Sequence, residues 1–175
     1  DLAAIVDLSG SMSGNDPTNR RREAVSLLID LAGQGDRLVG SGFDDGFRDF
    51  GTEAFPVLED AGFKATVFLP SAFIGKPFIT GRECLSASEV RMLADKGTEF
   101  GSHSVSHRRL VELSAKELGA ELRDSKAAIE DVVGRAVTTF SFPFRFPEQD
   151  GRFTTLLAGL LDECGYSGGV TTAIG

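Results

Sequence analysis

Two short motifs carry the residues of this sequence that are best suited to chemistry. The first is FDDG, in which Asp44 and Asp45 place two carboxylates side by side, and the second is HSVSH, which contains both histidines of the chain, His103 and His107. Two imidazoles and one carboxylate are a common ligand set for zinc or a similar divalent ion, and they leave positions for water and substrate. Because adjacent carboxylates repel each other, we expect one to bind the cation and the other to act as a base.

Each motif alone also has a structural interpretation. Asp-Asp-Gly is common in turns, and a histidine pair on a helix can simply lie on the surface. The argument for a metal site is that both histidines fall in one five-residue motif directly after an expected strand. Their spacing fits one face of a helical turn, so we expect His103 and His107 to reach the same ion.

The elements that must position these residues follow from hydrophobic periodicity. Strands are expected at residues 2–8, 37–43, 64–69, 99–102, 137–142 and 169–172, and helices at 19–32, 47–61, 114–133 and 153–164, with another beginning at Ser86. Ser86 and Ser114 are each followed after three residues by glutamate, the spacing of a capping box. Pro56 predicts a kink or a late start in the helix around it.

The order of these elements predicts an α/β fold with a mainly parallel sheet of βα units. The connections between strands are too long for hairpins, so right-handed crossovers are expected. In parallel α/β folds, active groups gather at the carboxyl ends of the strands. Both chemical motifs, and the FPFR segment at residues 142–145, follow expected strands.

Length and charge narrow the class of protein. The chain has 175 residues, which suits a single domain spanning 1–175, and a net charge of −8, which disfavours nucleic acid and anionic membranes as partners. It has no apolar run near the roughly 20 residues of a membrane span, and no signal peptide is visible. We therefore expect a soluble protein; the sequence specifies neither its compartment nor its oligomeric state. Cys84 and Cys164 lie in no motif and are expected to be buried structural residues.

Five longer runs of sequence contain or flank the two motifs: GFDDGFRDFGTEAFPVL, KATVFLPSAFIG, LSASEVRML, EFGSHSVSHRRL and FSFPF. With them, residues 41–175 resemble the polysaccharide deacetylase family of metal-dependent carbohydrate esterases. The resemblance implies an incomplete, distorted (β/α) barrel, with Asp45, His103 and His107 as metal ligands and Asp44 as catalytic base. It implies zinc as the metal, with cobalt, nickel and magnesium as alternatives. The implied substrate is an acetylated carbohydrate of the chitooligosaccharide, peptidoglycan or xylan type, which loses acetyl groups by amide or ester hydrolysis.

The sequence departs from the family pattern at two places. The loop that borders the acetyl pocket, usually R-x-P-Y or Y-P-F-G, aligns with Phe142, Pro143, Phe144 and Arg145. Phe142 replaces an aromatic hydroxyl, and Arg145 stands where glycine is usual. The family also carries a later histidine, in a Leu-x-x-His context, that protonates the leaving amine, and this sequence has no histidine after His107. We therefore expect slow hydrolysis.

The N-terminal 40 residues resemble a different family. The runs DLSGSM, RRREAVSLLID and GDRLVG make residues 1–40 similar to the opening of a von Willebrand factor type A domain. That likeness implies a second ion site, in which Asp7, Ser9 and Ser11 supply oxygen ligands to Mg²⁺. The alternative is a strand-to-helix turn with capping serines. We expect this segment to be fused into one continuous sheet with the rest of the chain.

Three functions follow from these patterns. The first is a metal-dependent deacetylase, and the second is a chimera that binds metal but is impaired in catalysis. The third is an adhesion module that binds a partner through Mg²⁺ at the DLSGSM loop. The identity and position of the bound metal discriminate among them.

Overall fold

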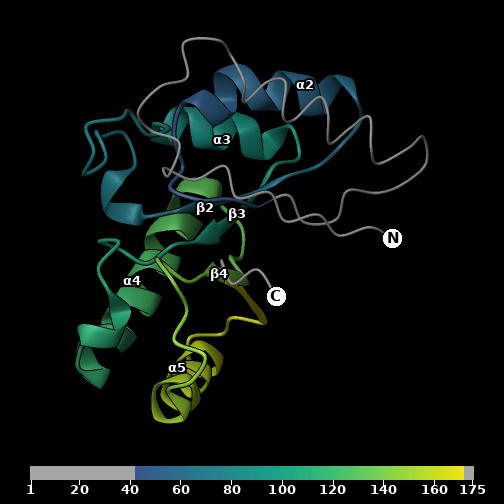
Figure 1. Cartoon of the computed structure of the whole chain (residues 1–175). Coiled ribbons are helices and arrows are strands. Elements are labelled where there is room, and N and C mark those ends of the chain that lie inside the picture. Colours follow the sequence, from purple (N-terminus) through teal and green to yellow (C-terminus); the bar gives the residue numbers. More distant parts are fainter. Residues whose placement is uncertain (1–41, 172–175) are drawn as a thin grey trace. The chain divides into compact units, whose positions relative to one another are not determined.

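A computed structural model describes residues 42–171 of the chain (Figure 1). The strand expected at residues 2–8 and the helix expected at 19–32 lie outside the described residues, as does most of the strand expected at 37–43. The residues Asp7, Ser9 and Ser11 of the expected Mg²⁺ site also lie outside them. Within the described part, no helix is both long and apolar enough to cross a membrane.

Five strands and four α-helices alternate along the described chain. The strands are β1 (Gly42–Phe43), β2 (Thr66–Leu69), β3 (Glu99–Ser102), β4 (Thr139–Ser141) and β5 (Gly168–Val170), and the α-helices are α2 (Phe55–Asp60), α3 (Ala87–Asp95), α4 (Ala115–Val133) and α5 (Gly151–Glu163). Short 3-10 helices lie at Ser71–Phe73 (η3) and Leu110–Glu112 (η4). The expected βα alternation is confirmed.

The strands hydrogen-bond in the order β1-β2-β3-β4-β5. β1 pairs parallel with β2, β3 with β4 and β4 with β5, with Phe43 opposite Val67 and Phe140 opposite Gly169. The backbone N–H of Glu99 donates to the Ala65 carbonyl at 2.9 Å, and that of His103 donates to the Leu69 carbonyl at 3.0 Å. The chain therefore has the parallel α/β fold that the sequence predicts.

The described chain divides into two compact units. One contains residues 42–67 and 75–99, and the other contains residues 68–74 and 100–171, so β2 and β3 each run from one unit into the other.

The first unit replaces the single helix expected at residues 47–61 with two segments. Residues Phe50–Ala54 form a π-helix (η2), in which the N–H of Phe55 donates to the Phe50 carbonyl, and α2 follows it. Pro56 lies at the start of α2, where its missing N–H costs no helical hydrogen bond, so the late start is confirmed. Leu58 is buried, whereas Val57 is only half-buried.

Both capping boxes are confirmed. The Ser86 and Ser114 hydroxyls accept from the N–H groups of Glu89 and Glu117, each at 3.3 Å, and each glutamate carboxylate accepts in return from the serine N–H. Burial raises the pKa of Glu89, but its hydrogen bonds with Ser86 outweigh this and the pKa is lowered. These caps fix where α3 and α4 begin.

The second unit is built around α4, which packs against α5. Gly134 ends α4 in the left-handed conformation, at φ 69°, as the sequence predicts. In β3, a Cβ at Gly101 would lie 2.5 Å from the ring of Phe68, so only glycine lets β3 approach β2 this closely. The Tyr166 hydroxyl donates to the Leu122 carbonyl at 2.8 Å and secures the chain before β5 to α4.

Candidate metal centre

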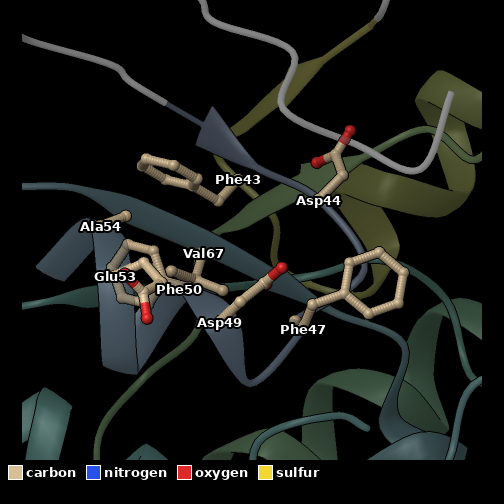
Figure 2. Close-up of a pocket in the computed structure, with 9 residues that line it drawn as sticks. Phe43, Asp44, Phe47, Asp49, Phe50, Glu53, Ala54 and Val67 are labelled. Carbon is tan, nitrogen blue, oxygen red and sulfur yellow. The ribbon is translucent and has the colours of Figure 1, made fainter. Parts of the chain in front are cut away.

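Asp44 and Asp45 follow β1 directly, in the first unit. Asp45 is buried, with 6% of its surface exposed, and Asp44 is half-buried. Asp45 and Gly46 are both left-handed, with φ of 68° and 59°, so the chain turns sharply at the second aspartate. Figure 2 shows the Asp44 carboxylate pointing away from Phe47 and Asp49. The two adjacent carboxylates therefore occupy different environments, as different roles require.

A mostly apolar hollow lies next to this turn (Figure 2). It is lined by Phe43, Asp44, Gly46, Phe47, Asp49, Phe50, Glu53, Ala54 and Val67. Phe43 and Phe50 contact each other in its wall, with ring centroids 4.8 Å apart. The packed rings hold the end of β1, and with it the aspartate pair, against α2 and η2.

Arg82 and Cys84 approach the aspartate turn from the following loop. Arg82 donates to Asp49 at 2.6 Å and lies 3.5 Å above the ring of Phe47. Burial lowers the pKa of Arg82, and the Asp45 carboxylate opposes that effect. Burial, with the Asp45 charge adding to it, raises the pKa of the Cys84 thiol to about 11.

Cys84 is therefore a buried, protonated thiol that donates to the Asp45 carbonyl at 3.6 Å, as expected for a structural cysteine. Cys164 differs from the expectation, since it lies at the partly exposed end of α5.

His103 lies directly after β3, in the second unit, and is 2% exposed. Its Nδ1 lies 2.8 Å from the Ser141 carbonyl oxygen, at the end of β4. A carbonyl can only accept, so Nδ1 carries a proton and donates it, which makes Nε2 the ring nitrogen that can act as a metal ligand. Second-shell hydrogen bonds of this kind are what orient metal-binding histidines.

The segment from His103 to His107 is a loop, so the helical turn expected there is wrong. Ser104 and His107 are left-handed, with φ of 66° and 53°, and the His107 N–H donates to the Ser104 hydroxyl at 3.0 Å. The N–H groups of Ser71 and Ala72 donate to the carbonyls of Ser104 and Val105. These bonds from a distant segment hold an irregular loop, which nevertheless brings the two imidazoles to 4.8 Å between ring centroids.

Glu121 of α4 holds the same loop from the other side. Its carboxylate accepts from the N–H groups of Val105 and Ser106, at 2.8 and 2.9 Å, and from the Ser106 hydroxyl at 2.5 Å. Charge-assisted hydrogen bonds are about twice as strong as neutral ones, so Glu121 is a strong anchor for the histidine loop. The sequence analysis missed this residue, because nothing in a helical glutamate signals a contact with a loop 15 residues earlier.

The FPFR segment divides into a buried and an exposed half. Phe142 and Pro143 are buried, and the Phe142 ring packs edge-on against Phe153 at 6.0 Å. Phe144 and Arg145 are exposed, and the Phe144 ring lies 4.7 Å from that of His107. Of the four residues, the structure places Phe144 directly beside a candidate metal ligand.

Residues 32–167 match the family model described as polysaccharide deacetylase. The chain belongs to the polysaccharide deacetylase family. The match begins before residue 41, so it includes residues 32–40, which the sequence analysis assigned to a von Willebrand factor type A likeness. The comparisons do not support that likeness.

Relatives agree with the family assignment. YxkH of Bacillus subtilis, named as a polysaccharide deacetylase, is 29% identical over 154 residues, which are 88% of this chain and 51% of YxkH. This chain therefore spans about half the length of that relative. IcaB from Ammonifex degensii superposes with a TM-score of 0.73 at 16% identity, over 94% of this chain and 82% of IcaB. The Streptococcus pyogenes deacetylase PplD superposes with a TM-score of 0.68 at 20% identity, over 99% and 82%. Both structures share the fold.

Proposed function

We propose that this protein is a metal-dependent hydrolase that removes acetyl groups from a carbohydrate polymer. Family membership supports the reaction class. The observation that carries the proposal for this chain is the buried His103, whose Nδ1–H is held by the Ser141 carbonyl. A buried imidazole whose Nδ1–H is held by a backbone carbonyl is the arrangement typical of metal-binding histidines, which then use Nε2 as the ligand atom.

We assign the role of metal ligands to Asp45 of the first unit and to His103 and His107 of the second. The mixed nitrogen and oxygen donors suit zinc first, with cobalt, nickel and magnesium as alternatives. When bound, such an ion acts as a Lewis acid toward the acetyl carbonyl and the attacking water.

The chain's own groups supply a base and an oxyanion donor for the proposed reaction. Asp44 is the general base that takes a proton from the attacking water, a role that contributes about 10²–10⁴-fold in typical enzymes. A backbone N–H near the site stabilises the oxyanion as the carbonyl is attacked. Phe144, exposed beside His107, offers an apolar face on which a sugar ring can rest, and the Phe142–Arg145 segment forms one wall of the acetyl pocket.

The proposed substrates are acetylated chitooligosaccharides, peptidoglycan or xylan. The competing proposal is a domain that binds metal without turnover, and the two differ in a single measurement. Acetate release from the three substrates, by protein whose metal content is determined in parallel, supports hydrolysis. One bound metal per chain without acetate release supports the binding-only domain.

His103→Ala tests the metal assignment directly. We expect this variant to retain less than about a tenth of the metal bound by the wild type and to lose hydrolysis. Lys116→Ala, on the exposed side of α4, is a matched control that should change neither property. Full metal occupancy in folded His103→Ala would contradict the proposal.

A further inference from the structure

Positive charge gathers beside the histidine loop of this acidic chain. Arg108 and Arg109 directly follow His107, and Arg145 directly follows Phe144, in a chain whose net charge is −8. All three arginines are exposed. None of them forms an ion pair with a carboxylate within residues 42–171. The edge beside His107 is therefore cationic, although Glu117 interacts with the charge of Arg108.

Arg109 is the arginine whose position is best defined. Its guanidinium carbon lies 5.7 Å from the centre of the Phe144 ring, and that ring lies 4.7 Å from the His107 ring. Phe144 is 47% exposed and left-handed, at φ 63°, which is unusual for a bulky residue. Arg108 is a weaker candidate, because its charge interacts with Glu117.

The charge of Arg109 disfavours metal binding nearby. A cation near a divalent ion weakens the binding of that ion by repulsion, so the arginine does not serve the proposed metal ligands. A guanidinium resting on an aromatic face still presents N–H donors at its edge, in the planar fork that matches a carboxylate. An arginine that served only as a solvated surface charge would not need to lie near the exposed Phe144 ring or close to His107.

We propose that Arg109, supported by Phe144, binds a carboxylate of the substrate, so that this protein selects acidic acetylated glycans, such as those bearing a uronic acid. The proposal rests on the deacetylase function proposed above. It adds a specificity-determining residue outside the metal ligands and outside the FPFR segment. The exposed Phe144 ring contacts the sugar, and the Arg109 guanidinium binds the carboxylate of that sugar.

The test compares two substrates that differ only in that charge. One is an acetylated oligosaccharide carrying a uronic acid, and the other is the same molecule after reduction of the uronate to the neutral sugar. For metal-loaded wild-type protein, we expect kcat/KM to favour the carboxylated substrate about tenfold, the low end of a hydrogen bond to a charged group. The ratio should fall to about one in Arg109→Gln and to an intermediate value in Arg109→Lys, which keeps the charge and loses the fork.

Arg123→Gln is the matched control, since Arg123 is an exposed arginine of α4 that already pairs with Asp124 at 3.3 Å. It should keep the wild-type ratio, and added salt should reduce that ratio. A wild-type ratio near one, or a ratio unchanged in Arg109→Gln, would overturn the inference.

A second arm separates this inference from the proposed function. Calorimetry measures binding of the deacetylated forms of the two oligosaccharides, which needs no turnover. Tighter binding of the carboxylated form by wild type, lost in Arg109→Gln, supports the inference, and equal binding of both forms overturns it. Absence of acetate release from either substrate would overturn the proposed function and leave the binding arm to decide the inference.

Discussion

The hydrogen bond between His103 and Ser141 decides how that imidazole can be used. Because Nδ1 donates to a carbonyl at 2.8 Å, the proton cannot move to Nε2 without breaking a buried hydrogen bond. Nε2 is therefore the ring atom that can act as a metal ligand while this hydrogen bond is kept. Ser141, at the end of β4, thus positions the His103 ring through its backbone carbonyl.

The aspartate pair gives the sharpest test at the level of single residues. Asp44→Asn should keep the bound metal and lower acetate release about 10²–10⁴-fold, because only the general base is removed. Asp45→Asn should lower metal affinity by more than about 100-fold and abolish hydrolysis, because a charged ligand becomes a neutral amide. Metal content and acetate release are measured on both purified variants. Equal loss of metal in the two would refute this division of roles.

The residues of the candidate site could be predicted from their types, but not the geometry that holds them. Both motifs follow strands, as the sequence predicts, because chain order and hydrophobic pattern are local properties. The loop form of HSVSH was missed because it depends on hydrogen bonds from Ser71 and Ala72, more than 30 residues earlier. The roles of Ser141 and Glu121 were missed for the same reason.

At the level of elements, α4 supports the histidine loop through Glu121. Replacing Glu121 with alanine leaves the N–H groups of Val105 and Ser106 without their acceptor, in a part-buried site. We expect Glu121→Ala to lower metal affinity about tenfold, as loss of an outer-shell partner typically does. The measurement is competition with a chelator, accompanied by hydrogen exchange at the Val105 and Ser106 amides of the metal-free protein.

Glu121→Gln is the conservative partner of that variant. Its amide oxygen can still accept from the backbone, so we expect metal affinity between those of wild type and Glu121→Ala. Unchanged exchange rates and metal affinity in Glu121→Ala would show that the loop is held without the carboxylate.

Glu130, near the end of α4, links this helix to the chain leading into β4. The Val137 N–H donates to its carboxylate at 2.9 Å, and Lys126 pairs with it at 3.0 Å. The hydrogen bond from Val137 lowers the pKa of Glu130 below its ordinary value of 4.5; burial opposes this, and the hydrogen bond and charge of Lys126 lower the pKa further. A carboxyl whose pKa is lowered by folding stabilises the native state above the unfolded pKa, and this contribution is lost as pH falls through the folded pKa.

Glu130→Gln should therefore reduce the free energy of unfolding at pH 7, and the difference from the wild type should shrink as the pH falls below 4.5. Urea unfolding at pH 7 and at pH 3.5 measures the difference. Glu163→Gln, on the exposed surface of α5, is the matched control. A destabilisation of the same size at both pH values would mean that the Glu130 charge is not the cause.

Element boundaries were most predictable where the signals are local. α4 begins and ends at residues that carry their own cap, Ser114 and Gly134, and β3 has the predicted bounds. The π-helix η2 was missed, because hydrophobic periodicity does not distinguish a bond to the fifth preceding residue from one to the fourth. The expected strand at 137–142 shortened to Thr139–Ser141, since Val137 bonds to Glu130 instead of continuing the ladder.

At the scale of the whole molecule, the family match and the order of strands both raise the question of what residues 1–31 contribute to the sheet. The match begins at residue 32, and β1 at Gly42–Phe43 is the first strand in the order that the structure describes. An unpaired edge strand exposes backbone N–H and C=O groups and invites aggregation. Our prediction that residues 2–8 form a parallel strand beside 37–43 would cover that edge.

Deletion of residues 1–31 tests this prediction while keeping every residue of the family match. Segments shorter than about 40 residues rarely form an independent core without metal or disulfides, so residues 1–31 should gain their stability from the sheet they join. The helix expected at 19–32 presents Leu27, Leu28 and Leu31, and burying three leucines contributes several kcal/mol at about 25 cal/mol per Å². We therefore expect the shortened chain to melt at a lower temperature or to aggregate, as measured by thermal unfolding and light scattering beside the full chain. A monomeric shortened chain with an unchanged melting temperature would show that residues 1–31 are an appendage to the deacetylase fold.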